Sequence, residues 1–191
     1  MLRLADDGYD IWFGSNRGTK YSNVNPRLDG ASDEERYDFS FYDFGVGDVP
    51  AMLDTITEVA GEKKVTYIGY SQGTSQMFYG LAKANPTLNL KLEKAILLAP
   101  CLWIEFGIDN MEQYDSTYPV FERNGVYALG TEDWEQDKAK VCESPKSYAC
   151  QYLGYMPEGM ETTPLKSFRQ YSQNYITSDF QEYIDDFSES N

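Results

Sequence analysis

The chain has 191 residues, no histidine, three cysteines and a formal net charge of -15 at pH 7. Apolar residues make up 41% of the chain and aromatic residues 15%, which excludes a disordered protein, and the length is sufficient to bury a core. The acidic charge repels phosphate groups, so a nucleic-acid partner and tight binding to acidic membranes are disfavoured. The apolar runs are far too short to cross a bilayer, and the first ten residues lack the apolar stretch of a signal peptide. These features predict a soluble globular protein without a transmembrane segment.

The first predicted strand is Tyr9 to Phe13 (YDIWF), a short aromatic and β-branched run. A helix is predicted after it, with Asp48 as its N-cap, Pro50 in its first turn and Gly61 just past its end. Its apolar residues repeat at helical spacing and predict the buried face: Val49, Met52, Leu53, Ile56, Val59 and Ala60.

Two further buried strands are predicted at Val65 to Ile68 and Ala95 to Ala99, with a helix between them that Asn85-Pro86 ends. The apolar spacing in this helix predicts a buried face of Thr74, Met77, Phe78, Leu81 and Ala82. Strands that alternate with helices over short connections are typical of a parallel sheet covered by helices, so residues 1–100 are predicted to form an α/β core. The alternation stops after residue 100. Residues 101–191 are predicted to form a second, mostly helical region, with a helix at Leu165 to Thr177.

The segment Gly69-Tyr70-Ser71-Gln72-Gly73 has the form Gly-x-Ser-x-Gly. In a nucleophile elbow this pattern lies between a strand and a helix, and its small residues let the two backbones approach closely. The predicted strand before the motif and the predicted helix after it meet this requirement. The motif therefore predicts Ser71 as a nucleophile and the Gln72 backbone N–H as a donor to an oxyanion. In the alternative interpretation, the glycines only form a tight turn and Ser71 caps the helix.

A serine hydroxyl needs a base to take its proton, and the usual base, histidine, is absent from the chain. The chain could thus be an enzyme without its base, part of a longer enzyme, or no enzyme. No metal or cofactor is expected. The cysteines lack zinc spacing, the acidic pairs lack the spacing of a calcium loop, and the glycines lack a phosphate-binding fingerprint.

Several stretches together carry a resemblance to a known family. They are LADDGYDIWFGSNRG (Leu4 to Gly18), YDFSFYDFGVGDVPAMLDTI (Tyr37 to Ile56), VTYIGYSQGTS (Val65 to Ser75), AILLAP (Ala95 to Pro100) and, more loosely, PLKSFRQYSQNYITSDFQEYID (Pro164 to Asp185). In order and spacing they resemble the acid lipase family of gastric and lysosomal lipases. The resemblance implies a partial α/β-hydrolase fold with residues 101–191 as its cap or lid. It also implies hydrolysis of neutral lipid esters by Ser71, and a lysosomal or secreted location.

The resemblance also implies that functional parts lie outside these 191 residues. In that family an upstream His-Gly pair supplies part of the oxyanion hole, and the Asp and His of the triad follow the lid. The family's usual residue before the serine is histidine, and here it is Tyr70. The family keeps an arginine where this chain has Arg17, which we interpret as a residue that holds its loop. The family's secretory habit implies a disulfide between Cys142 and Cys150, with Cys101 reduced.

Two hypotheses about function follow from these patterns. The first is a lipase-like carboxylic ester hydrolase whose substrate is a lipid ester, with this chain as the part that carries the nucleophile. The second is a non-catalytic binding or scaffold protein derived from the same fold. In that case the exposed edges of its sheet need a protein partner to cover them.

Overall fold

The computed structural model describes residues 2–23, 25, 28–102, 111–142, 144, 146–147, 149–151 and 162–185. Stretches of the predicted cap region, 103–110, 152–161 and 186–191, lie outside the described residues. The elements in chain order are α1 (Leu2–Asp6), α2 (Asp33–Arg36), α3 (Phe41–Asp43), the π-helix η2 (Phe44–Asp48), α4 (Val49–Ala60), β1 (Val65–Tyr70), α5 (Gln72–Ala82), α6 (Pro86–Lys91), β2 (Leu92–Leu98), α7 (Met111–Arg123), β3 (Ala128–Leu129), α8 (Trp134–Val141), β4 (Thr163–Pro164) and α10 (Leu165–Thr177).

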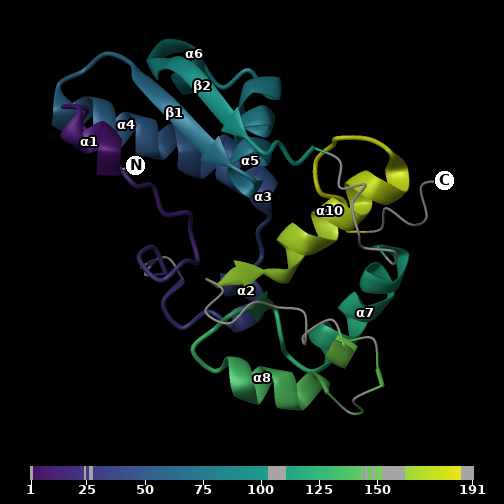
Figure 1. The fold of residues 1–191 in the computed structure, drawn as a ribbon. Helices are drawn as coiled ribbons and strands as arrows, with labels where there is room; N and C mark the ends of the chain where they lie inside the picture. Colours follow the sequence, from purple (N-terminus) through teal and green to yellow (C-terminus); the bar gives the residue numbers. More distant parts are fainter. Residues whose placement is uncertain are drawn as a thin grey trace.

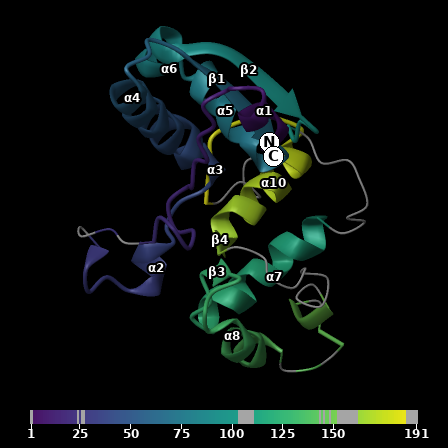
Figure 2. The same ribbon diagram turned by 60° about the vertical axis from the view of Figure 1, so that its left-hand side comes forward.

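These elements form two groups with α10 between them. One group contains β1 and β2 with α4, α5 and α6, and the other contains α7, α8, β3 and β4 (Figures 1 and 2). The first group contains a parallel sheet with flanking helices, which is the α/β arrangement predicted from the sequence. The division at residue 100 stays a prediction.

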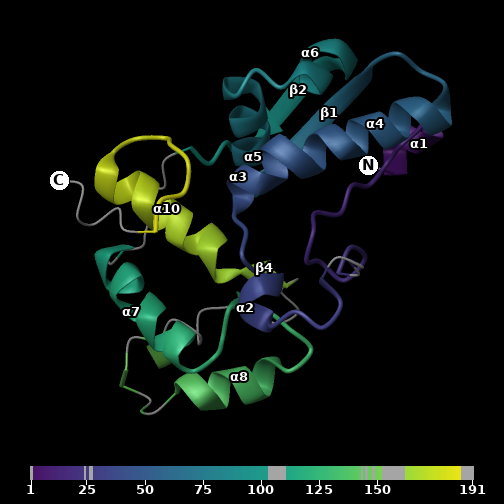
Figure 3. The same cartoon turned by 180° about the vertical axis from the view of Figure 1, so that it is seen from behind.

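The parallel sheet consists of β1 and β2, with Tyr67 opposite Ala95 and Tyr70 opposite Leu98. Side chains alternate between the two faces of a sheet, and here the two faces differ. The inner face packs against buried residues of α4, α5 and α6, which lie on the same side of the sheet (Figure 3). On the outer face, Tyr70 is 73% exposed and Leu98 is 49% exposed. The two predicted strands are thus confirmed with somewhat different ends, but their side chains are only partly buried and on one face only, because the helices packed against them lie on that face.

The predicted strand at Tyr9 to Phe13 is wrong. These residues have no strand structure, and Tyr9 is 64% exposed and Phe13 75% exposed. A strand needs a neighbouring strand to pair its backbone N–H and C=O groups. Among the described residues the parallel ladder contains β1 and β2 alone, and this segment pairs with neither of them. Aromatic and β-branched composition favours a half-buried pleated surface but does not supply that surface.

The helix predicted at Asp48 is confirmed at its end and corrected at its start. Gly61 ends α4 in the left-handed conformation, with φ of 70°, and Pro50 lies in the first turn as predicted. Asp48 makes no capping hydrogen bond and has helical backbone angles, because the helical segment already runs through α3 and η2 before it. The π-helical segment brings Gly45 against α5, where a Cβ atom would lie 2.2 Å from the carbonyl oxygen of Gln76.

The buried face of α5 is rotated relative to the prediction. Thr74 and Met77 are buried as predicted, but Leu81 and Ala82 are exposed. Ser75, Gln76 and Tyr79 are buried in their place. The reason is that α5 packs on α3 and η2 as well as on the sheet, and the tilted rings of Phe41 and Tyr79 lie 5.6 Å apart in that contact. The apolar spacing therefore predicted the position of the helix, but it did not predict which of its side chains would be buried against α3 and η2.

The second group of elements has its own core, which includes Phe121, Leu129, Val141 and Leu165. The short strands β3 and β4 pair antiparallel, and β4 leads directly into α10, whose bounds are those predicted from the sequence. Along the described ranges, no helix is both long and apolar enough to span a bilayer.

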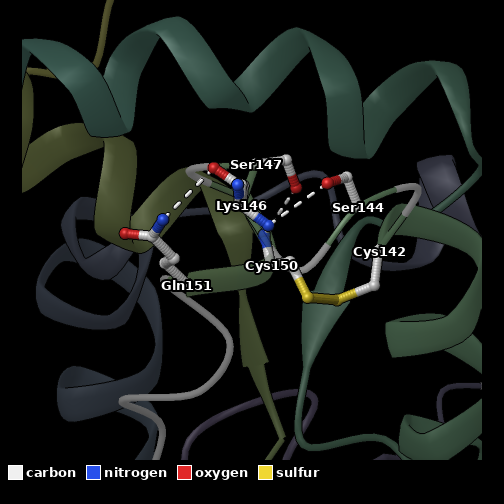
Figure 4. The surroundings of a disulfide bond; sticks show 6 residues. All are labelled: Cys142, Ser144, Lys146, Ser147, Cys150 and Gln151. Carbon is white, nitrogen blue, oxygen red and sulfur yellow. Dashed lines mark hydrogen bonds between the residues drawn. A yellow bond between two sulfur atoms is a disulfide. The ribbon is translucent and has the colours of Figure 1, made fainter.

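A disulfide joins Cys142 and Cys150 and closes a small loop after α8, as implied by the family resemblance (Figure 4). Within the loop, the Ser147 hydroxyl accepts a hydrogen bond from the backbone N–H of Cys150 at 3.2 Å. Ala149, next to Cys150, is buried in the core of the second group, and Cys142 packs against the same core. The disulfide thus ties the end of α8 to a short segment that enters this core. Cys101 is a free thiol.

Removal of this disulfide is expected to destabilise the chain. A closed loop of this size restricts the unfolded chain enough to stabilise the fold by about 2 to 3 kcal/mol. Urea unfolding of the double variant Cys142→Ser/Cys150→Ser, compared with wild type without reductant, measures the difference. Cys101→Ala is the matched control and should change the midpoint far less. A double variant with the wild-type midpoint would contradict the prediction.

Candidate active site

Ser71 lies in the turn between β1 and α5, where the sequence predicted it. Its backbone has φ of 52° and ψ of -118°, a conformation that costs energy for any residue other than glycine. The backbone N–H of Ser71 donates to the carbonyl oxygen of Leu98 at 3.0 Å, which ties the turn to the end of β2. Ser71 therefore stands at the carboxyl edge of the parallel sheet, where ligands bind in open α/β sheets.

The two glycines of the motif have different roles in this turn. A Cβ atom on Gly69 would lie 2.6 Å from the carbonyl oxygen of Gly73 and 2.7 Å from the Tyr67 ring. A Cβ atom on Gly73 would meet only the Tyr67 hydroxyl, at an ordinary contact distance of 3.4 Å. The close approach of β1 and α5 thus requires glycine at the first position and not at the second.

The Ser71 side chain does not cap α5, contrary to the alternative interpretation of the motif. Its Oγ lies 3.5 Å from the Sγ of Cys101. The Cys101 thiol donates to the carbonyl oxygen of Ala99 at 3.4 Å, so the Ser71 hydroxyl is the donor in its own contact with the sulfur. Within the described ranges, no carboxylate or amine hydrogen-bonds this hydroxyl, and the chain contains no histidine. The geometry presents the hydroxyl without a base beside it.

Gln72 is the first residue of α5 and directly follows Ser71. The first N–H groups of a helix have no acceptor within the helix, and they lie at the positive end of its dipole. The Gln72 N–H is thus oriented by the helix start and not by a side chain. This is the arrangement that a backbone oxyanion donor requires.

Two buried hydroxyls in the first turn of α5 hold the segment that follows β2. Thr74 Oγ1 donates to the carbonyl oxygen of Ser71 at 2.6 Å and accepts from the backbone N–H of Cys101 at 2.9 Å. Ser75 Oγ donates to the carbonyl oxygen of Cys101. Sequence reasoning missed these contacts, although two adjacent hydroxyl residues directly after the motif were a signal. They fix Cys101 beside the elbow.

A second set of polar contacts links the elbow to the N-terminal segment. The hydroxyl of the partly buried Tyr67 donates to the carbonyl oxygen of Gly73 at 2.7 Å and accepts from Gln76 Nε2 at 3.0 Å. Burial raises the pKa of the Tyr67 phenol above its ordinary value, so it stays a neutral donor. Asn16 Nδ2 in turn donates to Gln76 Oε1 at 2.8 Å. The loop around Asn16 is therefore anchored to α5 although it forms no strand.

Arg17 neighbours this anchor and binds Asp48. Its Nε donates to Asp48 Oδ1 at 2.8 Å, and its backbone N–H donates to Oδ2 at 2.9 Å. The guanidinium also lies 5.8 Å from the centre of the Phe39 ring. These contacts agree with a structural arginine that holds its loop against the start of α4.

The Arg17 contact is expected to contribute modestly to stability. The Arg17 side chain is 45% exposed, so solvent screens the pair, and its loss should lower the free energy of unfolding by about 0.5 to 1 kcal/mol. A double-mutant cycle of Arg17→Met and Asp48→Asn, followed by urea unfolding, isolates the pairwise energy. The coupling should shrink in 0.5 M salt. No coupling at low salt would contradict this expectation.

A hollow of about 1340 Å³ lies away from Ser71. It lies between the N-terminal loop, α4 and the segment of β3 and α8, and its lining includes Trp12, Met52, Gly130 and Lys140 but neither Ser71 nor Gln72. The elbow geometry, and not the size of this hollow, identifies the candidate site. In the described part of the chain, no three Cys, Asp or Glu side chains come together in a way that could hold a metal ion.

Comparison with known proteins agrees with this geometry. A family profile described as the alpha/beta hydrolase fold matches residues 2–137. A protein of Schizosaccharomyces pombe named as a probable lipase is 46% identical over 102 residues, which cover 53% of this chain and 21% of that protein. Gastric triacylglycerol lipase of Mus musculus is 37% identical over 103 residues, which cover 54% of this chain and 26% of that protein. Lipase member K of Homo sapiens is 36% identical over 110 residues, which cover 58% of this chain and 27% of that protein.

The matched region contains the Gly-x-Ser-x-Gly turn within the residues of the family profile. The chain spans only 21% to 27% of the length of these curated relatives. These similarities confirm the resemblance to the acid lipases as a partial chain. The profile match over residues 2–137 and the parallel sheet with its strand-to-helix turn together show that the chain belongs to the alpha/beta hydrolase fold family.

Proposed function

We propose that this chain is the nucleophile-bearing part of a lipase-like carboxylic ester hydrolase. The observation that carries the proposal is the backbone of Ser71, which adopts a strained positive φ between a parallel strand and a helix without capping that helix. Strain of this kind persists only where the surrounding structure enforces it, and it is typical of functional positions. The names of the matched relatives, which are lipases, support the same chemistry.

In the proposed reaction, Ser71 Oγ forms a bond to the acyl carbonyl carbon of the ester. The hydroxyl proton passes to a base, and the carbonyl electron pair moves onto oxygen, where the Gln72 N–H donates to the oxyanion. Collapse of this intermediate breaks the bond to the alcohol, which leaves with the proton. Water then hydrolyses the acyl-enzyme, and the carboxylic acid and Ser71 are released.

The base in this scheme is an imidazole that is not among these 191 residues, because the chain has no histidine. The neighbour of Ser71 Oγ in the described structure is a thiol whose proton is directed at Ala99. We further propose that the substrates are neutral lipid esters. The support for this class is the similarity to a lipase that is named for triacylglycerol.

The 191-residue chain alone is expected to show no ester hydrolysis above background. Without the triad base, only residual catalysis by binding and oxyanion contacts remains, and one backbone donor supplies little of it. Hydrolysis of a short-chain nitrophenyl ester measures this activity. Turnover that disappears in Ser71→Ala would contradict the expectation and show that another group activates the serine.

The proposed function is tested on protein from its native source with a fluorophosphonate, which reacts covalently with activated serines. Trypsin cleaves after Lys64 and Lys83, so Ser71 is recovered in the peptide Val65 to Lys83. Mass spectrometry should locate the label on Ser71 in native protein and not in heat-denatured protein. The proposal would be refuted if this peptide is recovered only in unlabelled form while other hydrolases of the same extract are labelled.

A second candidate function is a non-catalytic scaffold that binds a protein. The exposed outer face of β1 and β2, with Tyr70 and Leu98, favours it, because contiguous exposed apolar residues mark interaction surfaces. Under this hypothesis the fluorophosphonate does not label Ser71, and a partner protects this face from hydrogen exchange. The labelling experiment therefore separates the two functions.

A further inference from the structure

A chain of hydrogen bonds runs from α10 to the surroundings of Ser71. The Tyr171 hydroxyl on α10 lies 3.3 Å from Ser75 Oγ on α5. Ser75 Oγ in turn binds the carbonyl oxygen of Cys101, whose Sγ lies 3.5 Å from Ser71 Oγ. Residues far apart in the sequence thus meet near the nucleophile, and Ser75 and Cys101 link α10 to its surroundings.

The direction of these hydrogen bonds follows from the protons available. A serine hydroxyl has one proton, and that of Ser75 is donated to the Cys101 carbonyl, so Tyr171 must donate to Ser75. Burial raises the pKa of the Tyr171 phenol above its ordinary value, which keeps this donor protonated. The Tyr171 ring packs against Phe41 with centroids 4.4 Å apart, and Ser75 is completely buried. The donor and its acceptor are therefore both fixed by packing.

We propose that Tyr171 is a positioning residue that, through Ser75, holds the Cys101 segment against Ser71. The placement of α10 and the immediate surroundings of the nucleophile are thereby coupled. The functional meaning of this coupling rests on the proposed role of Ser71 as the nucleophile. The coupling itself is a property of the fold, so it can be measured without any ester reaction.

The experiment uses Ser71→Cys in the full 191-residue chain as a proximity probe. In a glutathione buffer, the introduced thiol and Cys101 form a disulfide by exchange, in which one oxidised glutathione becomes two reduced glutathione molecules. The equilibrium gives the effective concentration of the two thiols, and peptide mapping distinguishes this bond from Cys142–Cys150. Loss of one buried hydrogen bond should lower the effective concentration about five- to tenfold in the Tyr171→Phe background.

Two comparisons separate positioning from a general loss of stability. Tyr175→Phe, at an exposed position of the same helix, should leave the effective concentration unchanged. Ser75→Thr keeps the hydroxyl, and Ser75→Val lacks it but has a side chain of the same size as threonine. The Ser75→Thr variant should therefore keep a higher effective concentration of the two thiols than the Ser75→Val variant. Tyr171→Phe should have no further effect in the Ser75→Val background, because the two changes interrupt one path.

The proposal is overturned if Tyr171→Phe leaves the effective concentration unchanged, or if Ser75→Thr and Ser75→Val give the same value. Failure of the introduced thiol to pair with Cys101 in any background also overturns it. Circular dichroism and urea unfolding of every variant establish that the compared chains are folded. Fluorophosphonate labelling of native Ser71 is scored separately, so loss of the proposed function and loss of the proposed coupling give different results.

Discussion

Replacement of Ser71 by alanine is expected to lower ester turnover of the protein from its native host by roughly 10³- to 10⁶-fold. The substitution removes the atom that forms the acyl-enzyme and leaves the Gln72 N–H in place. Residual catalysis then comes only from binding and from oxyanion contacts. Initial rates on a triacylglycerol emulsion and on a short-chain nitrophenyl ester measure the loss, and both substrates should lose activity by similar factors.

The control for this variant is Ser147→Ala, which removes a serine hydroxyl from the disulfide loop (Figure 4). It should retain close to wild-type turnover, since its hydroxyl accepts from the backbone N–H of Cys150 and lies in a different group of elements from Ser71. Ser71→Ala with unchanged turnover would remove Ser71 from the mechanism. An equal loss in both variants would point to folding and not to chemistry.

Replacement of Gly69 by alanine is expected to lower the free energy of unfolding by about 3 kcal/mol, whereas Gly73→Ala should change it by less than about 1 kcal/mol. The added methyl group at Gly69 would lie 2.6 Å from a backbone carbonyl oxygen, which cannot move without displacing α5. The methyl group at Gly73 meets a hydroxyl at 3.4 Å, and alanine favours the helix that contains it.

Urea unfolding of the two variants provides the measurement, and each glycine serves as the control for the other. Both variants alter the same five-residue motif, so a difference between them reports the close approach and not the loss of the motif. Equal destabilisation by the two variants would show that the turn does not depend on the contact between Gly69 and Gly73.

Local sequence signals predicted the elements whose ends they mark. Gly61 ends α4 in a left-handed conformation, and the Gly-x-Ser-x-Gly motif gave the turn between β1 and α5. These features depend on a few neighbouring residues, which the sequence displays directly. The Cys142–Cys150 disulfide, in contrast, was implied by the secretory habit of the resembled family and not by a local pattern.

Features that depend on distant neighbours could not be predicted in this way. The side chain of Asp48 binds Arg17, 31 residues away, and makes no capping hydrogen bond, although its position suggested one. Tyr9 to Phe13 has strand composition but no strand beside it in the described structure. The contact of Tyr171 with Ser75 joins residues 96 apart, and no local pattern indicates it. The elbow itself was predictable, whereas the groups that surround it depend on tertiary packing.

The open outer face of the β1–β2 sheet has a calorimetric consequence. Heat capacity rises on unfolding because apolar surface becomes hydrated, by about 12 to 15 cal/mol/K per residue in typical domains. Tyr70, Ile96 and Leu98 are already 73%, 40% and 49% exposed in the folded chain, so their side chains add less to this increment than buried side chains do. The temperature dependence of the unfolding enthalpy should therefore be shallower than chain length suggests, and it should steepen when a bound protein covers this face.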